Sequence, residues 1–373
     1  MVFSDDTTLL TDPRLREIER GLQLGQRPGR DEALAMFETE DLAGLGMLAD
    51  RANLACNGDR VCYINNAHIN YTNICVNRCR FCAYRKPRPE APGAFFLSPE
   101  EVLDKAREIW NPRVRELHIV GGCHPDAPLD YYIQMLSLLR QEFPDVFIQS
   151  FTAVEIEHIA RKSGLHVAQV LAELRGAGLG SLPGGGGEIF SPAVRQRICP
   201  EKISGEQYLE VMRQAHLMGI PTNVTMLFGH IESTADRVDH LLAIRALQDE
   251  TGGFNSFIPL VFHPVNTGYS DLRKTSGVDI LRTIAISRLI LDNIRHIKAF
   301  WIMLGLPLTQ VALFFGADDV NGTVIEERIT HDAGAETPQH LNERELIRII
   351  TEAGRRPLER DTLYRPVERR QDG

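Results

Sequence analysis

The chain has 373 residues, of which 43% are hydrophobic and 24% charged, a globular composition that excludes a disordered or collagen-like protein. Its 41 lysines and arginines against 50 aspartates and glutamates leave a net charge of −9, which argues against sequence-independent binding of nucleic acid. No run is apolar for the about 20 residues that span a bilayer, and the acidic N-terminus lacks the basic region of a secretory signal, so we expect a cytoplasmic protein with no membrane contact.

The first sixty residues are predicted to be helical. One helix is expected from Asp12-Pro13 through Leu24, because proline is favoured in the first turn of a helix. A second is expected from about Glu40 to Cys56, ending at the stop signal Asn57-Gly58. No strand is predicted in this region, so residues 1–60 are interpreted as an N-terminal helical extension.

From residue 61 onward, strand-like runs alternate with helical runs. Several helices are predicted from capping signals, at Ser98–Glu101, Ser204–Gln207, Ser233–Asp236 and Asn342–Glu345. Eight strands are predicted near His68–Tyr71, Glu116–Val120, Val146–Phe151, Leu179–Leu182, Thr222–Phe228, Ser256–Leu260, His296–Ile302 and Gly322–Ile325. Strands that alternate with helices favour a parallel α/β sheet, whose closed form is a TIM-like (β/α)₈ barrel. We predict this barrel over residues 61–330 and a C-terminal helical extension over residues 331–373, with a doubly wound open sheet as the alternative.

Three of the seven cysteines are bunched directly after the first predicted strand of the barrel. Cys75, Cys79 and Cys82 have the spacing C-x3-C-x2-C, and residues 75–82 are called the cysteine loop below. Three thiolates on one loop can converge on one metal centre, and thiolate sulfur suits zinc or iron–sulfur chemistry. A structural zinc site usually has four protein ligands, so three ligands leave one position open, which suits a reactive centre. The alternative is three ordinary buried cysteines.

The cysteine loop, with Phe81 before the last cysteine, resembles the cluster-binding loop of the radical S-adenosylmethionine (radical SAM) superfamily. This resemblance implies that Cys75, Cys79 and Cys82 bind three irons of a [4Fe–4S] cluster. The fourth iron would take the amino and carboxylate groups of S-adenosylmethionine. One electron from the cluster would then cleave S-adenosylmethionine to methionine and a 5′-deoxyadenosyl radical.

Four further positions match weaker signatures of the same superfamily and are the predicted cofactor-binding residues. Gly121 and Gly122 end the second predicted strand and resemble the element that meets the methionine moiety, although Gly-Gly is also a common turn. Tyr84 matches the position that meets the adenine, with packing on the loop as the alternative. Glu155 follows a strand end and is expected either to bind the ribose hydroxyls or to favour a helix start.

Longer segments resemble the radical enzymes of the futalosine pathway to menaquinone, a group that also includes the two halves of the deazaflavin synthase. These segments are Thr152–Ile156, Ser181–Phe190, Ile198–Lys202, Gln248–Phe254 and Phe257–Pro264. Three segments look most like the aminodeoxyfutalosine synthase family, namely Cys199–Ser204, Lys298–Gly305 and Asp318–Glu327. The match runs from about residue 61 to residue 362. It departs from the family at Gly187, where alanine is expected, and at Cys123, where a larger aliphatic residue is expected.

The resemblance implies a reaction as well as a fold. The family joins the adenosyl group of S-adenosylmethionine to 3-[(1-carboxyvinyl)oxy]benzoate by radical addition. The products are 6-amino-6-deoxyfutalosine, methionine and bicarbonate. A low-potential electron donor such as flavodoxin or ferredoxin is the implied protein partner. Histidines at or near predicted strand ends are candidates to line the substrate pocket, and no catalytic acid or base is assigned: His68, His124, His230 and His263.

Two classes of alternative function remain open at this stage. The first is another enzyme of the same group, either the dehypoxanthine futalosine cyclase or a half of the deazaflavin synthase, which would release free 5′-deoxyadenosine. The second is a non-catalytic iron–sulfur electron carrier or a zinc-stabilised binding module. A carrier would more often supply four cysteines to each cluster.

Overall fold

The computed structural model describes residues 9–325 and 328–367. Three helices precede the first strand: α1 (Pro13–Gln23), α2 (Arg30–Glu38) and α3 (Leu42–Asn57). The first and third are the predicted ones. The Asp12 carboxylate accepts from the Arg14 N–H at the start of α1, and α3 ends at Gly58, which has a φ of 64°. Helix α2 was not predicted separately.

The strands form three parallel sheets that join into one ring. The strands are β1 (Arg60–Ile64), β2 (Asn66–Asn70), β3 (Glu116–Val120), β4 (Phe147–Ser150), β5 (Thr222–Phe228), β6 (Phe254–Val261), β7 (His296–Ile297), β8 (Asp319–Gly322) and β9 (Arg356–Glu359). Their orders within the sheets are β8-β1-β9, β2-β3-β4 and β5-β6-β7. Isolated parallel bridges connect the sheets, at Gln149–Ser181, Leu182–Thr222, Lys298–Asp319 and Ala67–Ile325. Because the pairings return to β2, the predicted barrel is confirmed and the open sheet is excluded.

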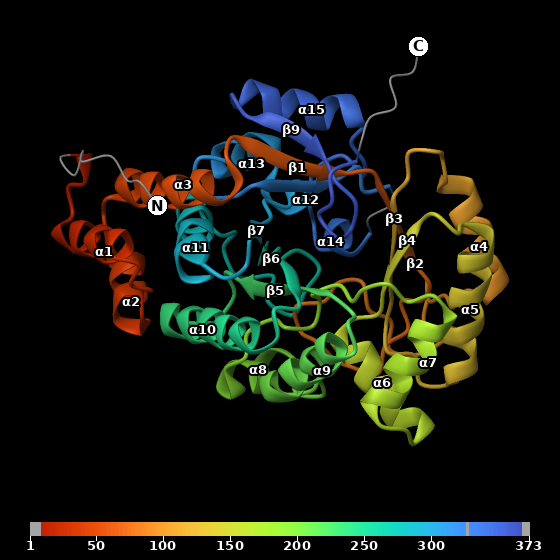
Figure 1. Cartoon of the computed structure of the whole chain (residues 1–373). Coiled ribbons are helices and arrows are strands. Elements are labelled where there is room, and N and C mark those ends of the chain that lie inside the picture. The colour runs from red at the N-terminus through yellow and green to blue at the C-terminus, as the bar shows by residue number, and fades with distance from the viewer. Residues whose placement is uncertain (1–8, 326–327, 368–373) are drawn as a thin grey trace, which may run out of the picture.

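The helices that follow the strands lie mainly around the outside of this ring (Figure 1). They are α4 (Pro99–Ile109), α5 (Leu129–Glu142), α6 (Ala153–Ser163), α7 (Val167–Ala177), α8 (Pro192–Ile198), α9 (Gly205–Leu217), α10 (Thr234–Thr251), α11 (Gly277–Ile290), α12 (Trp301–Leu304), α13 (Leu306–Ala312), α14 (Ile329–Asp332) and α15 (Glu343–Glu352). The predicted capping signals are confirmed. In each case the side chain accepts a hydrogen bond from the backbone N–H of the residue three positions later, at Ser98, Ser204, Ser233 and Asn342. Among the described residues, none of the helices combines the length and the apolar character needed to cross a membrane.

Several predicted strands are shorter than expected or displaced. Leu179–Leu182 contributes isolated bridges rather than a strand, and the run from His296 stops being a strand at Ile297. The eighth strand lies at Asp319–Gly322, before the predicted Gly322–Ile325. Strands β1 and β9 were missed. They pair with each other in parallel although they lie near opposite ends of the chain, as in the pairs Arg60–Arg356 and Tyr63–Glu359. The division of the chain into three parts at residues 60 and 330 stays a prediction.

The barrel places the predicted site at one end. The cysteine loop follows the carboxyl end of β2, and Gly121-Gly122 follows the carboxyl end of the neighbouring β3. Alternate residues along a strand face the same side of the sheet. Directly paired residues therefore share a face, and the pairs His68–His118 and Asn70–Val120 both face the interior of the barrel.

Candidate active site

The cysteine loop is held by backbone hydrogen bonds to four other segments, at Lys86, Cys123, Ile198 and Gly268. The Cys75 N–H donates to the Lys86 carbonyl at 3.0 Å, and the Arg80 N–H donates to the Ile198 carbonyl at 2.8 Å. Two of the sulfurs also face backbone donors. The Cys123 N–H lies 3.3 Å from the Cys75 sulfur, and the N–H groups of Tyr84 and Arg85 face the Cys82 sulfur. Such donors orient and stabilise thiolate ligands. The loop is therefore suited to supply the three protein ligands of an iron–sulfur cluster.

A buried cation lies beside these thiols. Burial raises the pKa of the Cys79 and Cys82 thiols, while the hydrogen bond with the Cys123 side chain lowers the pKa of Cys75 to about 6. The Lys202 ammonium lowers the pKa of all three thiols and forms an ion pair with Glu188 at 2.5 Å. The Lys202–Glu188 pair was not predicted as part of the site. The Lys202 ammonium partly offsets the negative charge that three thiolates would place in a buried loop.

Gly122 packs against the start of the cysteine loop, and Gly121 packs against the segment just before it. A Cβ atom on Gly122 would lie 2.2 Å from the Ile74 carbonyl oxygen and 2.9 Å from the Cys75 Cβ. A Cβ atom on Gly121 would lie 2.7 Å from the Tyr71 ring. A side chain at Gly122 would displace the start of the cysteine loop, and a side chain at Gly121 would displace the Tyr71 ring. The structure thus brings the predicted Gly-Gly element beside the predicted cluster ligands, while its contact with the methionine moiety stays a prediction.

Glu155 fixes this Gly-Gly element to the start of α6. One of its oxygens accepts from the Tyr71 hydroxyl at 2.7 Å and the Gly121 N–H at 3.1 Å, and the other accepts from the Thr152 N–H at 2.8 Å. Burial raises the pKa of Glu155 to about 7, although the hydrogen bonds from these donors lower it. The carboxylate is therefore engaged by protein donors, as the alternative role at a helix start predicted. Its contact with a ribose stays a prediction.

Tyr84 lies just beyond the last cysteine of the loop. Its side chain is buried, and its ring packs edge-on against Phe95, with the centroids 6.4 Å apart. The Tyr84 N–H also faces the Cys82 sulfur. The residue therefore braces the cysteine loop, and its contact with an adenine stays a prediction.

The interior of the barrel contains a cavity of about 260 Å³ that reaches Gly121. His68 stacks on His118 in this cavity with ring centroids 4.4 Å apart, and His118 Nδ1 lies 3.0 Å from the amide oxygen of Gln149. Lys298 also lines the cavity, on the segment after β7. Other polar residues line it too: Asn70, Glu116, Thr152, Asn223, Thr225 and Asn321. The core of a (β/α)₈ barrel is usually filled with branched apolar side chains, so this polar cavity is suited to a polar ligand.

Of the four histidines predicted as candidates, His68 lines the cavity and the other three bond to nearby backbone. His124 accepts from the Asp126 N–H, His230 Nε2 lies 3.0 Å from the Leu227 carbonyl, and His263 Nε2 lies 3.1 Å from the Met303 carbonyl. His118 was missed. The strand Glu116–Val120 had been predicted correctly, but nothing in it indicated which residues face inward.

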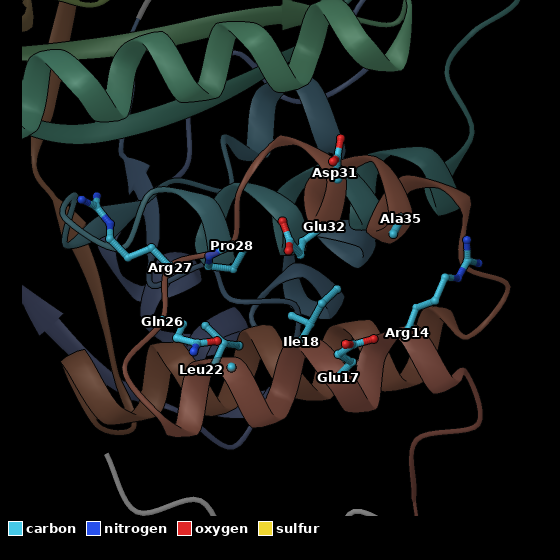
Figure 2. Close-up of a pocket in the computed structure, with 11 residues that line it drawn as sticks. Arg14, Glu17, Ile18, Leu22, Gln26, Arg27, Pro28, Asp31, Glu32 and Ala35 are labelled. Carbon is cyan, nitrogen blue, oxygen red and sulfur yellow. The ribbon is translucent and has the colours of Figure 1, made fainter.

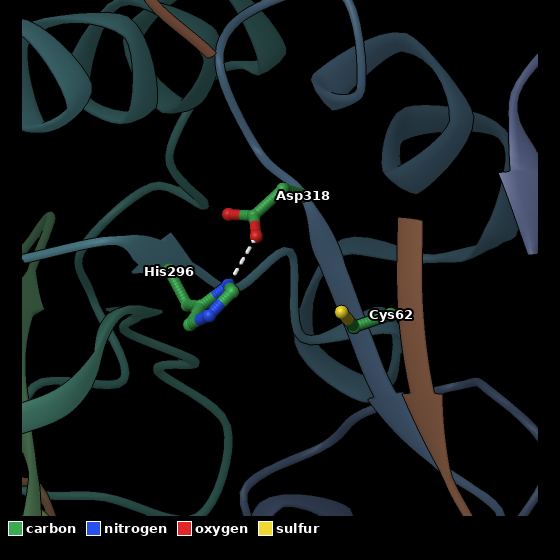
Figure 3. A group of neighbouring side chains, drawn as sticks. All are labelled: Cys62, His296 and Asp318. Carbon is green, nitrogen blue, oxygen red and sulfur yellow. Dashed lines mark hydrogen bonds and ion pairs between the residues drawn. The ribbon is translucent and has the colours of Figure 1, made fainter. Parts of the chain in front are cut away.

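Two other features lie apart from the cysteine loop. A surface cavity of about 340 Å³ lies between α1 and α2 (Figure 2), and the arginines at its rim are already paired, Arg14 with Glu38 and Arg27 with Asp249. The side chains of Cys62, His296 and Asp318 also lie close together (Figure 3).

That second group is a structural network rather than a metal centre. One oxygen of Asp318 accepts from Arg288 at 2.5 Å and from the Ile297 N–H at 2.8 Å, and the other lies 2.5 Å from His296 Nδ1. Both oxygens of the carboxylate are occupied, and a guanidinium sits where a cation would bind. The network ties β7 to β8.

The comparisons with known proteins agree with this geometry. The Radical SAM superfamily matches residues 69–244, and the CofH/MqnC C-terminal region matches residues 251–372. An aminodeoxyfutalosine synthase of Thermus thermophilus is 44% identical over 362 residues, covering 96% of this chain and 97% of the relative. The corresponding protein of Streptomyces coelicolor is 41% identical over 360 residues, covering 94% and 93%.

A second kind of relative is nearly as similar. A 5-amino-6-(D-ribitylamino)uracil–L-tyrosine 4-hydroxyphenyl transferase of Methanopyrus kandleri is 40% identical over 325 residues, covering 86% of this chain and 88% of the relative. Among solved structures, methylornithine synthase has a TM-score of 0.71 at 17% identity, covering 91% of this chain and 97% of that one. The [FeFe]-hydrogenase maturase HydG has a TM-score of 0.72 at 18% identity, covering 94% and 76%. These two structures support the fold alone.

Enzymes of this superfamily use a [4Fe–4S] cluster and S-adenosylmethionine, and the loop of three cysteines fits that cluster. An electron carrier or a zinc-stabilised module is therefore excluded. The chain belongs to the radical SAM superfamily and, within it, to the family that contains the aminodeoxyfutalosine synthases and the related tyrosine 4-hydroxyphenyl transferases.

Proposed function

We propose that the chain is an aminodeoxyfutalosine synthase, which joins the 5′-deoxyadenosyl group of S-adenosylmethionine to 3-[(1-carboxyvinyl)oxy]benzoate. The products are 6-amino-6-deoxyfutalosine, methionine and bicarbonate. The observation that carries the proposal is the 44% identity to the Thermus thermophilus synthase over 96% of the chain. The polar cavity beside Gly121 supports it, because the proposed substrate carries two carboxylates.

In this proposal, Cys75, Cys79 and Cys82 hold the cluster and leave one iron open to S-adenosylmethionine. When bound, the cluster supplies the electron that cleaves the sulfonium and frees the 5′-deoxyadenosyl group. Gly121 and Gly122 let the backbone approach the bound molecule closely, and Glu155 holds Gly121 in place through its N–H.

The chain must then direct addition rather than hydrogen abstraction. Addition requires the enol-ether carbon to be held about 3–3.5 Å from the 5′ carbon, in line for attack. The cavity starts at Gly121 and Thr152, next to the cysteine loop, and continues into the barrel between His118 and Lys298. A substrate lying along it would present one end toward the loop, while the closed barrel wall excludes water from the reacting atoms.

The second candidate is the tyrosine 4-hydroxyphenyl transferase reaction, favoured by the 40% identity to the Methanopyrus kandleri protein. Anaerobic turnover separates the two. The reconstituted protein is incubated with S-adenosylmethionine, a reductant and either the enolpyruvyl benzoate or L-tyrosine with 5-amino-6-(D-ribitylamino)uracil, and the products are identified by mass spectrometry. We expect an adenosyl–benzoate product from the first mixture. Turnover of the second mixture alone would overturn the proposal.

The same proposal includes a low-potential electron donor, such as flavodoxin or ferredoxin, and a cytoplasmic location. Reduction of the cluster by purified flavodoxin or ferredoxin, followed by electron paramagnetic resonance, tests the first of these.

A further inference from the structure

Lys298 is a buried cation that finds no hydrogen-bonded partner among the residues that the structure describes. It lies directly after β7, it is 5% exposed, and it lines the cavity inside the barrel. Within residues 9–325 and 328–367, its side chain makes no hydrogen bond and no ion pair, and its nearest ring contact is Tyr364, at 5.9 Å from the ring centroid. A buried ammonium without such a partner is unfavourable unless a ligand supplies one.

The neighbouring carboxylates are already committed to other donors. Asp319 accepts from Arg360 at 2.6 Å with one oxygen and from the Asn321 N–H at 2.5 Å with the other. Glu116 accepts from the Asn66 amide at 3.2 Å. The other buried lysine or arginine side chains of the described chain each donate to a carboxylate or a backbone carbonyl, as Lys202 does to Glu188.

The same cavity contains a second unpartnered polar atom. The Nε2 atom of His68 is buried and has no hydrogen-bond partner, although its ring stacks on His118. Burial lowers the pKa of His68, and the neighbouring His118 and Lys298 lower it further, so Lys298 lies close enough to His68 to affect it electrostatically. A cation and an unpaired histidine nitrogen in one cavity form a recognition site for a ligand anion.

Resting on the proposed function, we propose that Lys298 binds the ring carboxylate of the aromatic substrate deep in the barrel, with His68 Nε2 beside it. The chemistry of the substrate fixes its direction. The enol-ether double bond, with its own carboxylate, must lie at the end of the cavity near Gly121 and the cysteine loop. The ring carboxylate is attached meta to the ether oxygen and therefore extends away from that end, toward Lys298. Lys298 is thus assigned as a specificity-determining residue.

The experiment measures binding rather than turnover. Holoenzyme without reductant is titrated anaerobically by calorimetry with the enolpyruvyl benzoate and with its ring amide, 3-[(1-carboxyvinyl)oxy]benzamide. We expect the wild-type protein to bind the acid roughly 10- to 100-fold more tightly than the amide, as is typical of a charge-assisted hydrogen bond. Lys298→Met should remove this preference by weakening only the acid, and Lys298→Arg should retain a preference for the acid.

Lys274→Met is the matched control, because it removes the same charge from an exposed lysine that pairs with Glu336. It should leave both affinities unchanged. Iron and sulfide per chain should match the wild type in every variant, and substrate-free cleavage of S-adenosylmethionine should be unchanged in the Lys274→Met control.

The outcomes separate this assignment from the proposed function. If the wild-type protein turns over the benzoate but binds acid and amide equally, or if Lys298→Met weakens both ligands alike, the assignment of Lys298 is wrong and the function stands. If the wild-type protein neither binds nor consumes the benzoate, the proposed function is wrong and the assignment that rests on it is overturned too.

Discussion

Replacing Gly122 by alanine should disturb the cysteine loop more than any other single methyl group in the site. The added Cβ would lie 2.2 Å from the Ile74 carbonyl oxygen, 2.8 Å from the Ile74 carbonyl carbon and 2.9 Å from the Cys75 Cβ. An ordinary contact between such atoms is about 3.3–4 Å, so the start of the loop must move by roughly 1 Å. Overpacking of this kind costs about 1–3 kcal/mol. The movement should also weaken the hydrogen bond that the Cys75 sulfur accepts from the Cys123 N–H.

Two measurements test this prediction. Urea unfolding of the metal-free Gly122→Ala protein should show a free energy of unfolding lower by about 2 kcal/mol, within the range for overpacking. Iron and sulfide per chain after anaerobic reconstitution should fall below the wild-type content. The matched control is Gly176→Ala in α7, where a Cβ would meet nothing within 4 Å, and alanine should stabilise that helix by about 0.5–1 kcal/mol. A Gly122→Ala protein with wild-type stability and iron content would refute the reasoning.

Replacing any one of the three cysteines of the cysteine loop by alanine should abolish reductive cleavage of S-adenosylmethionine and lower the bound iron. The control Cys56→Ala, at an exposed cysteine outside the loop, should change neither. Full activity in a Cys79→Ala protein would reject the assignment. Glu155→Gln should lower the free energy of unfolding by about 1–3 kcal/mol, because the amide NH₂ would replace one of the two accepting oxygens and face either the Thr152 N–H or the donors of Tyr71 and Gly121. Unchanged urea unfolding would contradict this. Affinity for the benzoate should fall as the pH rises through about 8, because burial lowers the pKa of Lys298 to about 8 and a neutral amine no longer attracts a carboxylate. Calorimetry from about pH 6.5 to 9.5 measures this fall, which Lys298→Arg should remove, since arginine stays charged over that range. The charged or titratable neighbours of Lys298 are Arg360, Asp319, Glu116, Cys62, His68 and Tyr364.

The parts of the fold that depend on local interactions could be predicted from the sequence. The helix that starts at Ser98 was predicted because Ser98 and Glu101 satisfy each other's backbone N–H groups within one turn. Strands β1 and β9 were missed because each is stabilised by a partner far away in the chain. The segment Arg356–Glu359 has a proline and no apolar alternation, and its strand character comes from pairing with β1.

The candidate site divides in the same way. The spacing of the cysteine loop is a local pattern and predicted three converging thiols. The inward-facing residues of the barrel are different, because a shift of one residue in strand register exchanges the two faces of a strand. His118 and Lys298 could therefore be recognised as cavity residues only from the pairing of β3 and the position of the end of β7. The hydrogen bonds that Glu155 accepts from Tyr71 and Gly121 likewise depend on tertiary packing.

The fate of the adenosyl group tests the proposed synthase activity most directly. Reconstituted protein is supplied anaerobically with reductant, the enolpyruvyl benzoate and S-adenosylmethionine labelled in the adenosyl group, and the label is followed by mass spectrometry. Radical addition predicts that the label appears in a nucleoside–benzoate product, with one S-adenosylmethionine consumed for each product formed. Label found in free 5′-deoxyadenosine, with none in such a product, would contradict the synthase assignment and favour hydrogen abstraction, as in the cyclase or the deazaflavin synthase.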